Sequence, residues 1–200
     1  HLNSIYKTIK YFTYHIIKVE YKVRTTQELA LIAMFTAIVY VLRITIEIPF
    51  PLASYLKLEI WEIPIYIALI CFRFRTSLSV AALTFILVQV FSTGLPTGPA
   101  YNLIAILSVM LGILIVKKIN NNKINNMKTI IIAVVTSTIL RIVIMTIINA
   151  TVLPLSPPFG YNIPPEALPT MLLITGIFNG VITIYSVFLA SIISIKIYNK

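Results

Sequence analysis

The amino-acid sequence predicts an all-α membrane protein with six transmembrane helices and cytoplasmic N- and C-termini. Three observations lead to this fold class: the scarcity of charge, the long apolar runs and the placement of the basic residues. Apolar residue types make up 58% of the 200 residues, charged types make up only 11%, and the mean hydropathy is +0.95. A soluble domain carries roughly 25% charged residues, so this chain lacks the polar surface that a water-soluble globule needs.

Six apolar runs predict the helices, and basic, Pro-rich or Gly-rich segments separate them. We expect spans at residues 26–45, 59–72, 76–92, 101–116, 129–150 and 170–195. The second run is short for a full crossing, so we expect a helix that is tilted or that starts below the interface. The runs are continuous rather than alternating, which argues against the strands of a membrane barrel.

The chain is expected to divide into a basic N-terminal segment, residues 1–24, and a six-helix membrane domain, residues 25–200. The first segment is also aromatic, and it is either an interfacial helix on an anionic membrane surface or a partly ordered tail. The first residue is His1 rather than Met, so we expect the native start to lie upstream. The pattern of a cleavable signal peptide is not visible.

Basic residues concentrate on one predicted side of the membrane. With the N-terminus inside, the inner segments hold 13 of the 16 Lys and Arg residues, whereas Lys57 and Arg43 lie on the outer side and Arg141 lies within the fifth span. This bias predicts cytoplasmic termini by the positive-inside rule. It also explains the net charge of +10 as a consequence of topology, so nucleic acid is not an expected partner.

Residue types that carry most enzyme chemistry are scarce. Aspartate is absent, the histidines are His1 and His15, and the one cysteine is Cys71. The sequence offers no Gly-rich phosphate loop, catalytic triad or cluster of metal ligands. We therefore expect binding or transport rather than catalysis, without a metal or a cofactor.

Arg141 is the clearest polar residue within a predicted span. It lies 13 residues past Lys128, which is about 20 Å along a helix at 1.5 Å per residue. Charge at this depth is costly, so Arg141 is expected either to bond helix carbonyls or a glutamate, or to serve a ligand. Asn149, Asn179 and Gln89 lie in the outer halves of their spans, where they either tie helices together or line a polar cavity.

Ala33 and Ala37 form a small-xxx-small pair in the first span, within "AMFTA". Small residues at this spacing let another helix approach closely. That helix is either a neighbouring span of the same chain or a helix of a partner.

Several stretches of the chain resemble the substrate-binding S components of energy-coupling factor (ECF) vitamin transporters, and the riboflavin-type proteins most. "TTQELALIAMFTAIVYVLRITIEIPFP" resembles the first helix of this family, with its AxxxA motif at Ala33 and Ala37. "LKLEIWEIPIYIA" is similar to the family segment "LKxDFSDIPxLI", with Glu59 and Glu62 in place of two Asp.

Three further stretches carry asparagines at family positions. "STGLPTGPAYNLIAIL", "INATVLPL" and "IFNGVI" are similar to "TGG…ANFLMG", "xNYFVLLPL" and "PFNLIKG", which places Asn102, Asn149 and Asn179. The resemblance covers about residues 25–185. Two departures are visible, because Ile182 stands where the family has Lys after "FNLI", and Arg141 has no counterpart.

The resemblance implies an S component in the cell membrane that binds a vitamin, riboflavin or a related flavin, from outside. It implies a transmembrane T subunit and two ABC-type ATPases as partners, with the AxxxA face docking on the T subunit. The loop after the first helix would cap the ligand, and the vitamin would be transported cargo rather than a cofactor. The candidates for ligand binding are Tyr101, Asn102, Arg141, Asn149 and Asn179.

Glu59 and Glu62 are expected at the outer, N-terminal end of the second span. The helix dipole and the free N–H groups favour a carboxylate there. We expect the two residues to fix the lid loop to the helix start rather than to contact the ligand. Two alternatives to the flavin transporter are a membrane assembly protein whose polar residues only pack helices, and an S component for a different vitamin.

Overall fold

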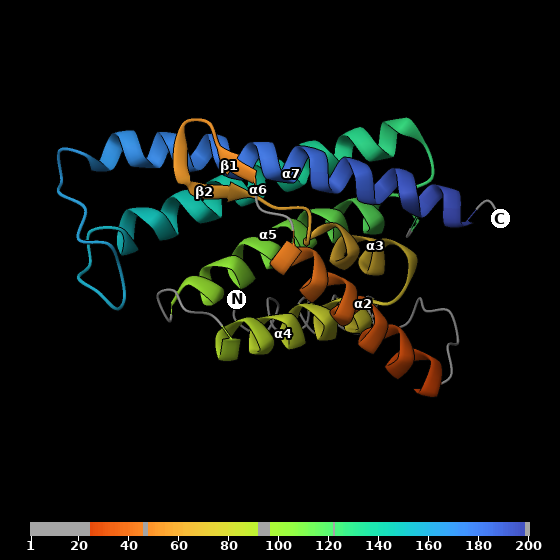
Figure 1. Ribbon diagram of the computed structural model, residues 1–200. Coiled ribbons are helices and arrows are strands. Elements are labelled where there is room, and N and C mark those ends of the chain that lie inside the picture. The colour runs from red at the N-terminus through yellow and green to blue at the C-terminus, as the bar shows by residue number, and fades with distance from the viewer. Residues whose placement is uncertain (1–24, 46–47, 92–96, 122, 199–200) are drawn as a thin grey trace, which may run out of the picture.

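The computed structural model describes residues 25–45, 48–91, 97–121 and 123–198 (Figure 1). The described residues form six helices and one two-stranded hairpin. In chain order the elements are α2 (Thr25–Thr45), β1 (Ile48–Phe50), β2 (Ala53–Leu58), α3 (Ile63–Cys71), α4 (Phe74–Phe91), α5 (Gly98–Ile119), α6 (Met127–Val152) and α7 (Leu168–Tyr198). The expected basic segment, residues 1–24, lies outside the described residues, and its structure stays a prediction.

Five of the described helices, namely α2, α4, α5, α6 and α7, are long and apolar enough to cross a membrane. Their bounds agree with the predicted spans to within a few residues. The second predicted span is also helical, but α3 has only nine residues, or about 14 Å at 1.5 Å per residue. The hydrocarbon core of a bilayer is about 30 Å thick, so α3 does not cross it alone.

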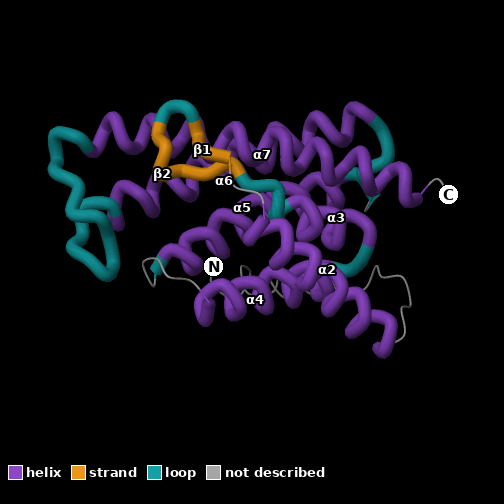
Figure 2. Tube along the Cα trace, in the orientation of Figure 1, coloured by secondary structure: helices purple, strands orange, loops and turns teal. Residues whose placement is uncertain are grey.

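The helices lie in layers around α3, as Figures 1 and 2 show. Helices α6 and α7 run side by side, α5 packs on α6, and α2 packs on α4. Helix α3 lies between these groups and contacts α7, α4 and α2. The short helix therefore sits in the interior of the bundle rather than at its edge.

Helix α3 is held at both ends. Every residue from Ile63 to Ile70 is buried, and Pro64 occupies the first turn, where its missing N–H costs no helical hydrogen bond. At the other end, Lys117 Nζ of α5 donates to the carbonyl oxygens of Leu69 (2.8 Å) and Ile70 (3.3 Å). A cation at a helix C-terminus satisfies free carbonyls and complements the dipole, so Lys117 fixes where α3 ends.

Helices α5 and α6 cross closely at Gly112. A Cβ atom at this position would lie 2.6 Å from the Cα of Ser137, so no side chain fits without moving the backbone.

The start of α6 is fixed by a capping box, in which Asn126 Oδ1 accepts from the Thr129 backbone N–H and Thr129 Oγ1 accepts from the Asn126 backbone N–H. Such a box satisfies two free backbone donors at the start of the helix.

The hairpin corrects the all-α prediction. The sequence led us to expect an irregular loop after the first helix, because Pro49 and Pro51 end helices. Instead, β1 and β2 pair antiparallel, with Pro49 opposite Lys57. An isolated hairpin is marginal in water, but the buried Phe50 ring packs edge-on against Phe178 of α7, with ring centroids 5.4 Å apart. Packing against α7 supports the hairpin in a way that local sequence does not show.

Candidate functional site

A buried ion pair joins the start of α3 to the middle of α6. Arg141 Nη1 donates to Glu62 Oε2 at 2.6 Å, and Arg141 Nη2 donates to Glu62 Oε1 at 2.9 Å. The two side chains are only 3% and 5% exposed. This bidentate geometry matches the two N–H groups of the guanidinium to the two oxygens of the carboxylate, and such charged hydrogen bonds are strong.

Two neighbours complete this buried cluster. Arg141 Nε donates to Asn179 Oδ1 of α7 at 2.9 Å, and the Tyr66 hydroxyl of α3 donates to Glu62 Oε2 at 2.8 Å. Asn179 Nδ2 in turn donates to the Thr175 carbonyl oxygen at 2.8 Å. The side chains of Arg141, Glu62 and Asn179 therefore all have partners within the bundle, and three helices meet at one set of polar bonds.

Glu62 does not interact with the start of α3 in the way that the helix-dipole argument predicts. Glu62 is the residue that precedes α3, yet its side chain makes no capping hydrogen bond. It pairs instead with Arg141, which is 79 positions away in the chain. The sequence left the partner of Arg141 open between a glutamate, helix carbonyls and a ligand, and the structure supplies the glutamate.

Glu59 forms a second polar centre nearer the hairpin. Its carboxylate accepts from the indole N–H of Trp61 and pairs with Arg43 Nη1 of α2 at 3.4 Å. Its backbone carbonyl accepts from the Tyr185 hydroxyl of α7 at 2.7 Å. The short segment between β2 and α3 is thus tied to α2, α6 and α7, and the predicted lid role of Glu59 and Glu62 stays a prediction.

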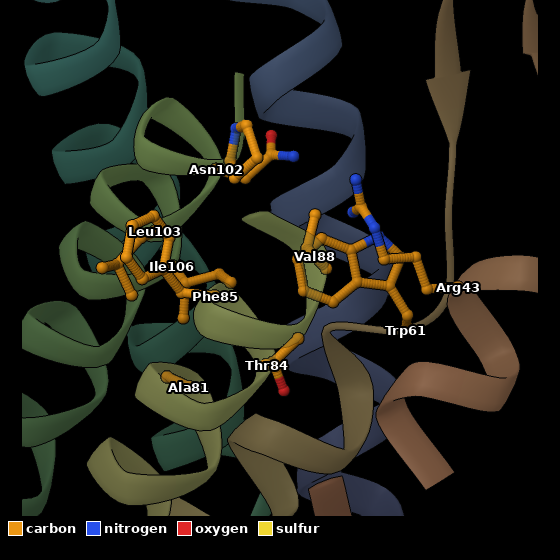
Figure 3. Close-up of a pocket in the computed structure, with 10 residues that line it drawn as sticks. Arg43, Trp61, Ala81, Thr84, Phe85, Val88, Asn102, Leu103 and Ile106 are labelled. Atoms are coloured by element: carbon orange, nitrogen blue, oxygen red, sulfur yellow. The ribbon is translucent and has the colours of Figure 1, made fainter. Parts of the chain in front are cut away.

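A pocket opens beside this segment, between the end of α2, α4 and α5. In Figure 3, Trp61 and Arg43 lie on one side of it, Leu103 and Ile106 lie on the other, and Asn102 stands at one end. The lining residues are Arg43, Trp61, Ala81, Thr84, Phe85, Val88, Pro99, Asn102, Leu103 and Ile106. The side chains nearly fill this space: the room left inside is about 10 Å³, roughly enough for one water molecule. Typical ligand pockets hold roughly 300–1,000 Å³.

The predicted ligand-binding residues fall in different places. Asn102 lines the pocket, whereas Arg141 and Asn179 meet in the buried cluster. Tyr101 donates its hydroxyl to the Phe159 carbonyl at 2.5 Å and so holds the loop between α6 and α7 on the start of α5. Asn149 lies half-buried near the end of α6. No described hydrogen bond joins the three asparagines to one another.

Ala33 and Ala37 are exposed on α2. The buried residues of this helix, Phe35, Thr36 and Val39, pack inward instead. The small-residue pair therefore faces away from the buried side of α2, and its use in docking a partner stays a prediction.

Sequence reasoning missed the contribution of Trp61 and Arg43. Trp61 is the one tryptophan of the chain, and Arg43 was noted only as a basic residue on the outer side. An aromatic residue directly beside a glutamate at a predicted helix start was the available signal.

Among the described residues, no group of three or more His, Cys, Asp or Glu side chains is arranged to hold a metal.

We expect Arg141→Met to lower the thermal midpoint of the protein in detergent strongly. Removing one member of a buried ion pair costs about 3–5 kcal/mol, because the other charge is left without a partner. The double variant Arg141→Met with Glu62→Gln removes both charges and keeps an acceptor for Tyr66, so it should regain most of the loss. A single variant as stable as the wild type, or a double variant no better than the single one, would contradict this account.

Comparison with known proteins places the chain in a family. Residues 27–195 match the family model described as "ECF transporter, substrate-specific component". A solved structure described as "Structure and mechanism of the S component of a bacterial ECF transporter" shares 27% sequence identity, with a TM-score of 0.63, over 88% of this chain and 95% of that chain. No curated protein matches. Because the family model spans most of the chain, the chain belongs to the family of substrate-specific components of ECF transporters.

Proposed function

We propose that this substrate-specific component captures riboflavin or a related flavin from outside the cell and delivers it for uptake. Components of this family are transporter subunits rather than enzymes, and they work with T and ATPase subunits in an ECF transporter. The flavin as substrate goes beyond the family assignment, and the residues that surround the pocket support it.

The observation that carries the proposal is the pairing of aromatic and amide groups in one pocket. Trp61 and Phe85 offer aromatic surfaces, and Asn102 offers an amide that can both donate and accept. A flavin ring needs stacking partners and amide-type partners more than it needs anions. The narrowness of the space implies that side chains on its walls move when a ring system enters.

Asn149, Asn179, Arg141 and Tyr101 are proposed as further residues of the ligand site. Tyr101 supports this through its hydroxyl, which ties the loop between α6 and α7 to α5 beside the pocket residue Asn102. Arg141 and Asn179 would contribute indirectly. Their buried cluster fixes the start of α3 and thereby the position of Trp61. The hairpin and Glu59 would form the lid over this end of the bundle.

For the membrane we propose six helical segments, with both termini in the cytoplasm and the hairpin on the outer side. The five long helices support this arrangement, with α3 as a sixth segment that lies buried among them. Inner segments then hold 13 of the 16 basic residues, as the positive-inside rule expects. A multi-pass location in the plasma membrane follows for a transporter component of this kind.

The first test is the identity of the bound molecule. Protein purified from cells grown with riboflavin should carry a yellow, fluorescent ligand, and mass spectrometry of the released ligand should identify a flavin. A different vitamin in that fraction would replace the flavin while keeping the transporter role. A protein that carries no small molecule and binds none of a vitamin panel would favour a membrane assembly role instead.

The second prediction concerns the three asparagines. Replacing a ligand-bonded amide with Leu should cost roughly 1–3 kcal/mol of binding free energy, because the ligand group is left unpaired. Titration of Asn102→Leu and Asn149→Leu with riboflavin measures this cost. Asn179→Leu measures the indirect contribution of the buried cluster, because its amide bonds Arg141 and Thr175. Asn125→Leu, in the exposed segment before α6, is the control. If all three variants bind riboflavin as the wild type does, the asparagine site is wrong.

The third prediction concerns docking on the T subunit. Ala33→Trp or Ala37→Trp puts a large ring on the exposed small-residue pair, so it should block assembly with the T and ATPase subunits and leave ligand binding intact. Ile139→Trp is the matched control, because Ile139 is 56% exposed on α6, away from that face. Co-purification of both alanine variants at wild-type levels would remove α2 as the docking helix.

A further inference from the structure

Arg43 brings α2 into contact with the pocket wall. Its guanidinium carbon lies 4.8 Å from the centroid of the Trp61 ring, and its Nη1 lies 3.4 Å from Glu59 Oε2. The indole N–H of Trp61 donates to that same carboxylate oxygen. The charge of Arg43 thus acts on Trp61 twice, directly through the ring face and indirectly through Glu59.

The three side chains of this contact differ in how much of their surface is exposed. Trp61 is only 3% exposed, whereas the side chains of Arg43 and Glu59 are 20% and 18% exposed. Water therefore weakens the Arg43–Glu59 attraction, while the ring that it holds forms part of the pocket. A modest change at this partly exposed ion pair therefore acts on the buried Trp61 ring.

Arg43 links helix α2 to the pocket. Of its residues, Phe35, Thr36 and Val39 are buried, and much of its remaining surface is exposed. Arg43 is the residue of α2 among those that line the pocket. A shift or rotation of α2 therefore reaches the pocket through Arg43, Glu59 and Trp61.

We propose that Arg43 is a positioning residue that holds Trp61 on the pocket wall and thereby couples the position of α2 to ligand retention. The ligand part of this inference rests on the proposed flavin site, and the positioning part does not. The end of α2 would act as a latch that keeps the indole in place while α2 is packed on α4. Movement of α2 would release the indole and open the narrow space beside it.

The chain offers a closely matched control. Arg73 pairs with Glu28 near the other end of α2, with an N–O distance of 3.9 Å and side chains that are 21% and 22% exposed. Arg73→Gln removes an ion pair of similar exposure that also tethers α2, but one that is far from Trp61 in the bundle. Arg43→Gln and Arg73→Gln therefore separate a specific effect on Trp61 from a general loosening of α2.

The first measurement is tryptophan fluorescence of the isolated protein in detergent, with acrylamide as a neutral quencher. Because Trp61 is the one tryptophan, the signal reports a single site. We expect stronger quenching in Arg43→Gln than in the wild type, wild-type quenching in Arg73→Gln, and partial recovery in Arg43→Lys, which keeps a cation. Equal quenching in Arg43→Gln and the wild type, or equal increases in the two Gln variants, would overturn the positioning role.

The second measurement is the dissociation rate of riboflavin from the same samples. Arg43→Gln should release riboflavin about 5-fold faster, as expected for the loss of one partly exposed ion pair and one cation–π contact, while Arg73→Gln keeps the wild-type rate. An unchanged rate despite stronger quenching would overturn the link to retention. A wild-type protein that does not bind riboflavin would count against the flavin assignment alone, and the quenching result would still decide the role of Arg43.

Discussion

The buried pairing of Arg141 with Glu62 is the constraint on which the arrangement of the other helices depends. A charge in the interior of a membrane bundle cannot be left alone, because its desolvation is repaid only by a partner with good geometry. The pair is two-pronged and almost fully buried. It therefore fixes the start of α3 against α6, and Asn179 extends the same set of bonds to α7. Lys117 holds the opposite end of α3, so polar bonds place an apolar helix that is too short to place itself across the bilayer.

The placement of α3 also sets the geometry of the pocket. Trp61 and Glu59 precede α3 directly in the chain, so fixing Glu62 restricts where the indole can lie. The hairpin enters this segment from the other side and rests on α7 through Phe50 and Phe178. The pocket wall is thus held on one side by the buried Arg141–Glu62 pair and on the other by the packing of Phe50 on Phe178. Arg43 of α2 is a partly exposed attachment of this wall, with its side chain 20% exposed.

The sequence predicts much of this fold because the bilayer imposes a length and a composition on each span. Helices α2, α4, α5, α6 and α7 lie where apolar runs of about 20 residues predict them. The short run before Arg73 also yields a helix, as predicted, with its limited length noted. Pairing across the chain is different, since nothing local states that Arg141 meets Glu62 at a separation of 79 positions. The hairpin was missed for a related reason: two prolines argue against strands locally, and only the contact with α7 outweighs them. The cluster of Trp61, Arg43 and Asn102 likewise depends on three segments that meet only in the folded chain.

Helix α2 combines two surfaces with opposite requirements. One surface buries Phe35, Thr36 and Val39, which holds the helix on the bundle. The other exposes the small residues Ala33 and Ala37, which add little packing energy of their own but permit a close approach by another helix. A helix with a narrow buried stripe is held less firmly than α3, which is buried on all sides. The chain thus combines a core element that is fixed on all sides with a peripheral helix that is packed on one side. In this chain, the charged contact at the end of α2 is where the peripheral helix meets the pocket.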